Sequence, residues 1–215
     1  TELYLMGDIF DFWFEYHRVV PRGFTRVLAR LAELSARGVR VVLFTGNHDM
    51  WCYDYLEEEC GVEIVRNPRV VELDGVKVHL AHGDNLNISG QPMLKLMNTI
   101  FRSSVARTLF SWLVHPDLAL KFGCWWSGKS RKSHNKTLMG VDNLRPLVEY
   151  AREHNLKNGD VEHYIFGHMH LPHYVREERF EILFLGDWCG TEAVYATMDD
   201  DNNLKLNTFA IDETV

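Results

Sequence analysis

Four short polar clusters, each placed directly after an apolar run, constrain the fold of this chain more than any other feature. In chain order they are Gly7-Asp8-Ile9-Phe10-Asp11, Gly46-Asn47-His48-Asp49, Ala81-His82-Gly83-Asp84 and Gly167-His168-Met169-His170. The run before the second cluster, residues 39–45, is hydrophobic apart from Arg40 and Thr45, as in a strand buried in a parallel sheet. Because open α/β sheets bind ligands at the carboxyl ends of their strands, we expect functional side chains at these four positions.

The first half of the chain predicts parallel strands. A short apolar strand over residues 3–6 precedes an amphipathic helix over residues 23–37, whose apolar residues recur with a period near 3.6. Gly38 stands where a helix commonly ends, and the strand over residues 39–45 follows. A strand, a helix and a strand in this order predict a right-handed parallel unit. A short helix is expected over residues 53–59.

Antiparallel hairpins are predicted later in the chain. Asp74-Gly75, a dipeptide typical of two-residue turns, joins alternating strands over residues 70–80. Two more hairpins are expected near the end, turned by residues 177–179 and 200–203. The predicted fold class is therefore α/β, an α+β sandwich of two packed mixed β-sheets flanked by helices.

Residues 85–155 interrupt this pattern with apolar residues at helical spacing and no strand signal. We expect residues 1–215 to form a single domain in which 85–155 are a helical insertion, or cap, over the end of the sheet. A helix that is apolar on nearly all sides needs apolar partners to bury its surface, and a substrate with acyl chains or a membrane surface would supply them. The alternative is that these helices are additional core.

Composition excludes several classes of protein. A net charge of -7 argues against a nucleic-acid partner, which would favour a basic surface. The 4 cysteines show no C-x-x-C spacing, as expected for thiols in a reducing compartment. No apolar run reaches the roughly 18 residues of a membrane span, so a cytoplasmic protein is predicted.

The side chains of the four clusters suit metal chemistry. Carboxylate, amide oxygen and imidazole groups together favour borderline divalent ions such as manganese, iron or zinc. Two such ions about 3.5–4 Å apart hold a phosphoryl group and activate water for attack at phosphorus. A structural role is the alternative for any one histidine taken alone, but four clusters at four strand ends favour the metal interpretation.

These clusters resemble four of the five blocks of the calcineurin-like metallophosphoesterase superfamily, whose pattern is D-x-H, G-D-x-x-D, G-N-H-D/E, a lone His and G-H-x-H. The resemblance implies a set of metal ligands: a bridging Asp8, with Asn47, His82 and His168 on one metal and His170 on the other. It also implies catalytic roles for Asn47 and for His48, which would act as an acid or contact phosphate and be oriented by Asp49. The implied cofactor is a pair of divalent metal ions, with manganese expected.

The D-x-H block has no counterpart in these residues. We expect it on a strand that precedes Thr1, where it would complete the second metal site. The alternative is a protein that has lost one of the two metals.

Within the superfamily, the chain is similar to the UDP-2,3-diacylglucosamine hydrolases, the pyrophosphatases of lipid A biosynthesis. The similarity lies in the aromatic residues after the first cluster, in His115-Pro116-Asp117 and in Leu185-Gly186-Asp187-Trp188. It implies hydrolysis of an acylated nucleotide sugar to UMP and acylated glucosamine 1-phosphate. Many such hydrolases carry Arg at the position of His48, which keeps a sister branch of the family open.

The resemblance also suggests substrate contacts. The insertion would hold acyl chains, since each buried methylene is worth about 0.8 kcal/mol, and it would permit peripheral contact with the inner membrane. Phosphate and sugar oxygens would be bound by a basic and serine-rich stretch: Arg131, Lys136, Ser127, Ser130 and Ser133. The alternative for this stretch is a solvated loop. Phe12, Trp13 and Phe14 are expected in the core rather than stacked on a ligand.

Two other functions stay open at this stage. One is a phosphoesterase with the same metals and a soluble nucleotide or phosphomonoester as substrate. The other is a metal-poor binding scaffold of the same fold, which the six intact positions of the clusters argue against.

Overall fold

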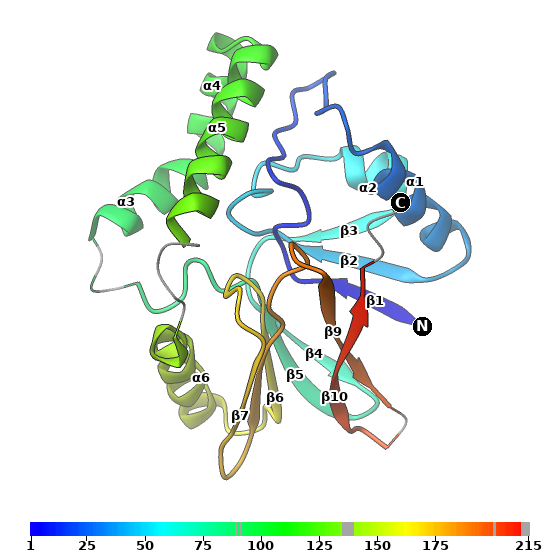
Figure 1. The fold of residues 1–215 in the computed structure, drawn as a ribbon, viewed down its shortest axis with the longest axis vertical. Coiled ribbons are helices and arrows are strands. Elements are labelled where there is room, and N and C mark those ends of the chain that lie inside the picture. Colours follow the sequence, from blue (N-terminus) through cyan, green and yellow to red (C-terminus); the bar gives the residue numbers. More distant parts are fainter. Residues whose placement is uncertain (89, 91, 135–139, 200, 212–215) are drawn as a thin grey trace. The chain divides into compact units, whose positions relative to one another are not determined.

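The structure is a computed structural model that describes residues 1–88, 90, 92–134, 140–199 and 201–211 (Figure 1). It divides into two compact units, which we describe separately. Unit 1 comprises Thr1–Asn67 and Ile88–Leu138, and unit 2 comprises Pro68–Asn87 and Met139–Val215.

Unit 1 contains a parallel three-stranded sheet. Its strands, in the order in which they pair, are β1 (Glu2–Leu5), β2 (Arg40–Phe44) and β3 (Val62–Val65). The central strand is buried over Val41 to Phe44, as its continuous hydrophobicity predicts. The predicted parallel pairing of the first two strands is therefore confirmed. The third strand was not predicted, because a four-residue segment with one charged residue carries little periodicity.

Two helices cover this sheet. Helix α1 (Thr25–Ala36) is followed by Gly38 in the left-handed conformation, and α2 (Tyr55–Cys60) ends at Gly61, which is left-handed as well. Their buried side chains Leu31 and Leu56 join a core cluster with the sheet residue Leu43. Both helices agree with the sequence prediction within two residues.

The helices of the predicted insertion lie mainly in unit 1. They are α3 (Pro92–Phe101), α4 (Ser104–Leu113) and α5 (Pro116–His134). Proline is favoured at the first position of a helix, where its missing N–H costs nothing, and Pro92 and Pro116 both begin helices. Ser103 caps α4 by accepting a hydrogen bond from the backbone N–H of Ala106.

Unit 2 is built on a mixed five-stranded sheet. Its strands, in the order in which they pair, are β4 (Arg69–Leu73), β5 (Val76–Ala81), β6 (His163–Phe166), β8 (Glu181–Phe184) and β7 (His173–Arg176). The central strands β5, β6 and β8 are parallel, and β4 and β7 are antiparallel to their neighbours. Asp74 and Gly75 both have positive φ, as the predicted two-residue turn requires.

The remaining elements of unit 2 are a short 3-10 helix η1 (Val141–Leu144), helix α6 (Arg145–Asn158) and the antiparallel pair β9 (Glu192–Met198) and β10 (Leu204–Ala210). Helix α6 packs on the five-stranded sheet through a cluster that includes Leu147, Ala151 and Tyr164 (Figure 1). The three predicted hairpins are confirmed.

These observations confirm the predicted mixed α/β class, with several sheets flanked by helices. The described strands form separate sheets of three, five and two strands, of which the first is parallel throughout. Among the described residues, no helix is long and apolar enough to cross a membrane.

Candidate metal centre

In unit 1, the first two polar clusters are joined by the carboxylate of Asp49. This side chain is fully buried; its Oδ1 accepts a hydrogen bond of 2.6 Å from the backbone N–H of Gly46, and its Oδ2 accepts one of 2.9 Å from Ile9. Asp8 completes the link, because its Oδ1 accepts a hydrogen bond of 2.8 Å from the backbone N–H of His48. Residues 40 positions apart thus form one rigid pair of loops.

Gly46 allows these two loops to approach each other. A Cβ atom at this position would lie 2.1 Å from Oδ1 of Asp8 and 2.7 Å from its backbone N, far inside van der Waals contact. Asp8 itself has a φ of 54°, a left-handed conformation that is uncommon for a non-glycine residue. Strain of this kind concentrates at functional positions, where the surrounding structure maintains it.

The side chain of His48 contacts the backbone of the first cluster. Its Nδ1 lies 2.8 Å from the backbone carbonyl oxygen of Asp11, and since a carbonyl only accepts, Nδ1 carries the proton. Asp49, the expected orienting residue, accepts hydrogen bonds from the backbone of both loops, and its role toward His48 stays a prediction. A histidine followed by a carboxylate in the sequence does not show which group orients the ring, because a backbone carbonyl such as that of Asp11 has no sequence signature.

Of the three aromatic residues expected in the core after the first cluster, Trp13 and Phe14 are buried and Phe12 is half-buried. The backbone N–H of Trp13 donates to the carbonyl oxygen of His48 over 2.9 Å. Glu15, which the sequence analysis did not single out, is also buried. It accepts hydrogen bonds from the indole N–H of Trp13 and from the backbone N–H of Tyr53, which ties the segment to the start of α2. A charged residue inside an aromatic run was the signal for such a buried acceptor.

In unit 2, the third and fourth clusters meet at one edge of the sheet. His82 follows β5 and His168 follows β6, and these strands are parallel neighbours whose last residues, Ala81 and Phe166, are paired. The two imidazole rings are 5.1 Å apart between centroids and are inclined by 68°. His168 has a φ of 57°, so a second predicted metal ligand has a left-handed backbone.

His170, the last predicted ligand, lies beside a carboxylate from the next strand. Its Nδ1 is 2.7 Å from Oδ2 of Asp187, which follows β8. The sequence analysis quoted Asp187 within a motif but assigned it no role.

Most of the predicted substrate contacts lie outside the described residues. Ser130, Arg131 and Ser133 belong to the last turns of α5, and their side chains lie outside the described residues, as does Lys136 entirely. Ser127 is 1% exposed, which is unsuitable for a surface contact with a sugar or phosphate. The other four contacts stay predictions.

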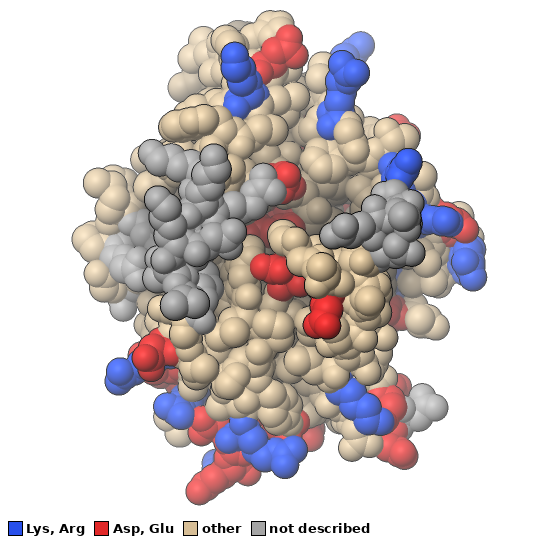
Figure 2. Space-filling view, in the orientation of Figure 1, with Lys and Arg blue, Asp and Glu red and all other residues tan. Residues whose placement is uncertain are grey.

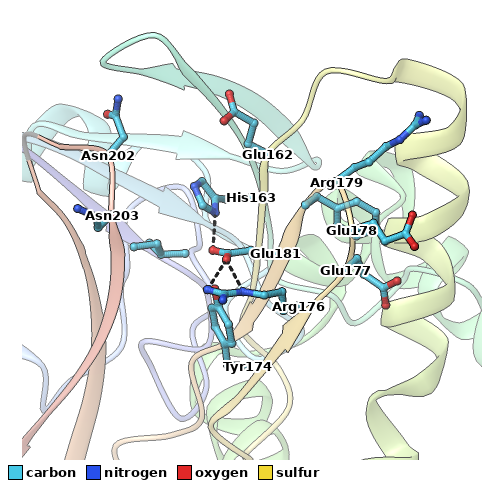
Figure 3. A pocket seen from close by; sticks show the side chains of 12 residues that line it. Glu162, His163, Tyr174, Arg176, Glu177, Glu178, Arg179, Glu181, Asn202 and Asn203 are labelled. Atoms are coloured by element: carbon cyan, nitrogen blue, oxygen red, sulfur yellow. Dashed lines mark hydrogen bonds and ion pairs between the residues drawn. The ribbon is translucent and has the colours of Figure 1, made fainter.

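A polar cavity of about 470 Å³ lies elsewhere in unit 2 (Figure 3). It is lined by His163 at the start of β6 and by Glu181 at the start of β8, whereas His168 follows the other end of β6. Glu181 lies 3.5 Å from Nδ1 of His163 and 2.9 Å from the guanidinium of Arg176, which neutralises the charge of this carboxylate. This cavity is therefore separate from the predicted ligands of unit 2.

The donor groups of the two units fit divalent metal ions. Unit 1 presents a carboxylate and an amide oxygen, and unit 2 presents three imidazole groups at one sheet edge. Imidazole groups suit zinc and iron, and carboxylate and amide oxygens suit manganese, so each set consists of donors that divalent metal ions use. The left-handed backbone at Asp8 and His168 is a further structural sign of function at these positions.

The chain is similar to several known proteins. A UDP-2,3-diacylglucosamine hydrolase of Porphyromonas gingivalis is 39% identical over 92% of this chain and 84% of its own length. A protein of the same name from Histophilus somni is 26% identical over 90% of this chain and 80% of its own. Among solved structures, an archaeal phosphodiesterase matches 83% of this chain and 74% of its own, with a TM-score of 0.42 and 12% identity.

The family model described as calcineurin-like phosphoesterase matches residues 2–172, a segment that contains all four polar clusters. Together with the 39% identity to the Porphyromonas protein, this match covers far more than isolated motifs. The chain therefore belongs to the calcineurin-like phosphoesterase family.

Proposed function

We propose that this protein hydrolyses the pyrophosphate bond of UDP-2,3-diacylglucosamine and releases UMP and acylated glucosamine 1-phosphate, a step of lipid A biosynthesis. The observation that carries the proposal is the 39% identity, over 92% of the chain, to a hydrolase named for this substrate. The phosphoesterase family supplies the matching class of reaction.

We propose that the reaction uses a pair of divalent metal ions, which would supply charge neutralisation at the phosphate and an activated water. The proposed ligands are Asp8 and Asn47 from unit 1 and His82, His168 and His170 from unit 2. Manganese is the proposed metal, because mixed oxygen and imidazole donors suit it.

His48 is proposed to contact a phosphate oxygen through its Nε2 atom. The hydrogen bond from Nδ1 to the Asp11 carbonyl holds the ring in one orientation and leaves Nε2 to face the substrate. When the ring is protonated, Nε2 donates to a phosphate oxygen and neutralises part of its charge. Asn47 and Asp49 are proposed to assist from the same loop, Asp49 by holding the backbone that carries His48.

The acyl chains are proposed to bind along the helices of unit 1. Large apolar side chains are exposed on α4 and α5, among them Leu109 at 58%, Trp112 at 87% and Leu113 at 73%. Figure 2 shows few charged side chains on the visible surface over these helices. Such an exposed apolar surface is unusual for a protein without an apolar ligand or partner, and peripheral contact with the inner membrane is part of the proposal. Ser130, Arg131, Ser133 and Lys136 remain proposed contacts of the sugar and phosphates.

The direct test is release of UMP from acylated UDP-glucosamine by the full-length protein, with and without added Mn²⁺. Metal-dependent formation of UMP is expected, and His168→Gln, which removes a proposed ligand, is expected to reduce it by more than the roughly 10- to 100-fold that loss of an outer-shell partner causes. Cleavage of a small chromogenic phosphodiester without UMP release would support a phosphoesterase with another substrate. Absence of both activities and of bound transition metal would support the binding scaffold instead.

A further inference from the structure

Asp187 holds the predicted metal ligand His170 through a short hydrogen bond within unit 2. Nδ1 of His170 is 2.7 Å from Oδ2 of Asp187, and the other carboxylate oxygen, Oδ1, accepts a hydrogen bond of 3.2 Å from the backbone N–H of Cys189. The carboxylate is thus held at both oxygens, one by its own turn and one by the imidazole.

Strand pairing explains why these two residues meet although they are 17 positions apart. Strands β6 and β8 are parallel neighbours, and their last residues, Phe166 and Phe184, are paired. The segments that follow them therefore leave the sheet at the same edge. His170 comes four residues after the end of β6, and Asp187 comes three residues after the end of β8.

Gly186 permits the close approach of these two segments. Its φ is +73°, and a Cβ atom there would lie 2.5 Å from Cγ of Pro172. Only glycine fits a left-handed position that is packed this tightly against a proline ring. The turn that presents Asp187 is therefore shaped toward the segment that carries His170.

The chemistry of the contact determines which ring nitrogen binds metal. An ionised carboxylate only accepts hydrogen bonds, so Nδ1 of His170 donates its proton to Asp187. In the neutral ring, the lone pair is then on Nε2. Metal-binding histidines commonly use one nitrogen for the metal and donate the other N–H to a carboxylate, which fixes the tautomer and makes the ring a stronger ligand.

We infer that Asp187 is a positioning residue that sets the tautomer and the orientation of His170 for metal binding through Nε2. This inference rests on the proposed metal-dependent function and names a residue to which neither the family pattern nor the sequence analysis assigned a role. The competing interpretation is a surface ion pair without function, since both side chains are partly exposed, 40% for His170 and 35% for Asp187.

Metal affinity distinguishes the two interpretations. We would titrate the full-length protein with Mn²⁺, without substrate, and follow the electron paramagnetic resonance signal of the free ion. Asp187→Ala is expected to weaken binding about 10- to 100-fold, the usual effect of removing the carboxylate partner of a metal-binding histidine. Asp187→Asn keeps an acceptor oxygen without the charge and should lose less. Asp142→Asn, at an exposed carboxylate of η1, is the matched control and should bind as the wild type does.

A double-mutant comparison tests whether Asp187 acts through His170. In a His170→Gln background, Asp187→Ala should cause no further loss of Mn²⁺ affinity. An equal loss in both backgrounds, or wild-type affinity in Asp187→Ala, would overturn the inference.

The tautomer of His170 can also be measured by spectroscopy in the metal-free protein. Nitrogen NMR of the imidazole rings in mildly alkaline buffer should show the Nδ1-protonated tautomer for His170, assigned by its absence in His170→Gln. Asp187→Ala should shift the ring toward the Nε2-protonated tautomer, and an unchanged tautomer would reject the role of Asp187.

These results separate this inference from the proposed function. A wild-type protein that binds Mn²⁺ in an Asp187-dependent manner but releases no UMP would leave the inference intact and reject the substrate. A wild-type protein that releases UMP while Asp187→Ala keeps its full Mn²⁺ affinity would reject the inference alone.

Discussion

In unit 1 the carboxylate of Asp49 is fully buried and accepts hydrogen bonds from two backbone N–H groups. In unit 2 the carboxylate of Asp187 is 35% exposed and accepts one hydrogen bond from the backbone of its own turn and one from the His170 side chain. The first carboxylate joins two loops of the chain, and the second orients one imidazole ring. A buried carboxylate that accepts hydrogen bonds from the backbone of two loops stabilises the fold and the site that these loops carry. A partly exposed carboxylate that accepts a hydrogen bond from an imidazole orients that ring and contributes little to the stability of the fold.

The largest expected effect is on the stability of unit 1. Asp49→Ala removes the acceptor of the buried N–H groups of Gly46 and Ile9, and we expect the free energy of unfolding to fall by about 3–5 kcal/mol. Asp187→Ala should lower it by less than about 1 kcal/mol. Urea denaturation of the metal-free proteins measures both values, and equal losses in the two variants would contradict the comparison.

Acid should affect unit 2 more than unit 1, because His79 lies in the core of unit 2. It is 2% exposed, its Nε2 is 3.1 Å from the hydroxyl of Tyr150, and its ring stacks on Tyr164. Burial, with a smaller contribution from the charge of His154, lowers the pKa of His79 to about 4 from its ordinary value of 6.5. The unfolded chain therefore binds a proton that the folded chain excludes, and stability declines as the pH falls from about 6.5 to about 4, by about 3 kcal/mol in total.

Hydrogen exchange resolved by residue measures this effect. Protection of the amides of β5 and β6 should decrease over that pH interval, and His79→Phe should make the decrease shallower. His154, whose pKa is also lowered by burial, should account for part of the slope that remains. An identical slope in wild type and His79→Phe would show that His79 is not the responsible group.

The smallest expected effect concerns the surfaces of the two units. Figure 2 shows Lys and Arg mixed with Asp and Glu at the lower edge of the view, where the turn between β7 and β8 lies in unit 2, whereas α4 of unit 1 exposes Leu109 and Leu113. The double variant Leu109→Ser with Leu113→Ser should lower kcat/KM for the acylated substrate about tenfold, or about 1.4 kcal/mol, because fewer methylenes are buried on binding.

Leu156→Ser is the matched control for this double variant, because Leu156 is 84% exposed on α6 of unit 2. It should leave kcat/KM unchanged. Activity on a small chromogenic phosphodiester should be the same in all three proteins. A similar loss on both substrates would mean that α4 supports the fold and does not bind acyl chains.

Much of the fold was predictable from local patterns. Asp74-Gly75 specified its turn because both residues tolerate positive φ, and the apolar period of residues 23–37 located α1. The strand β3 escaped prediction because four residues carry little pattern. The contact of Asp11 with His48 escaped it because a backbone carbonyl has no sequence signature.

The sequence by itself determined the donor groups of the proposed metal centre and their places at strand ends, because hydrophobic runs and the polar residues after them are local properties of the chain. Only the tertiary structure decided which group holds which ligand. Asp187 reaches His170 through the pairing of β6 with β8, and Asp49 reaches Ile9 across 40 residues. Such partners depend on strand order and register, which the whole core sets and no short segment encodes.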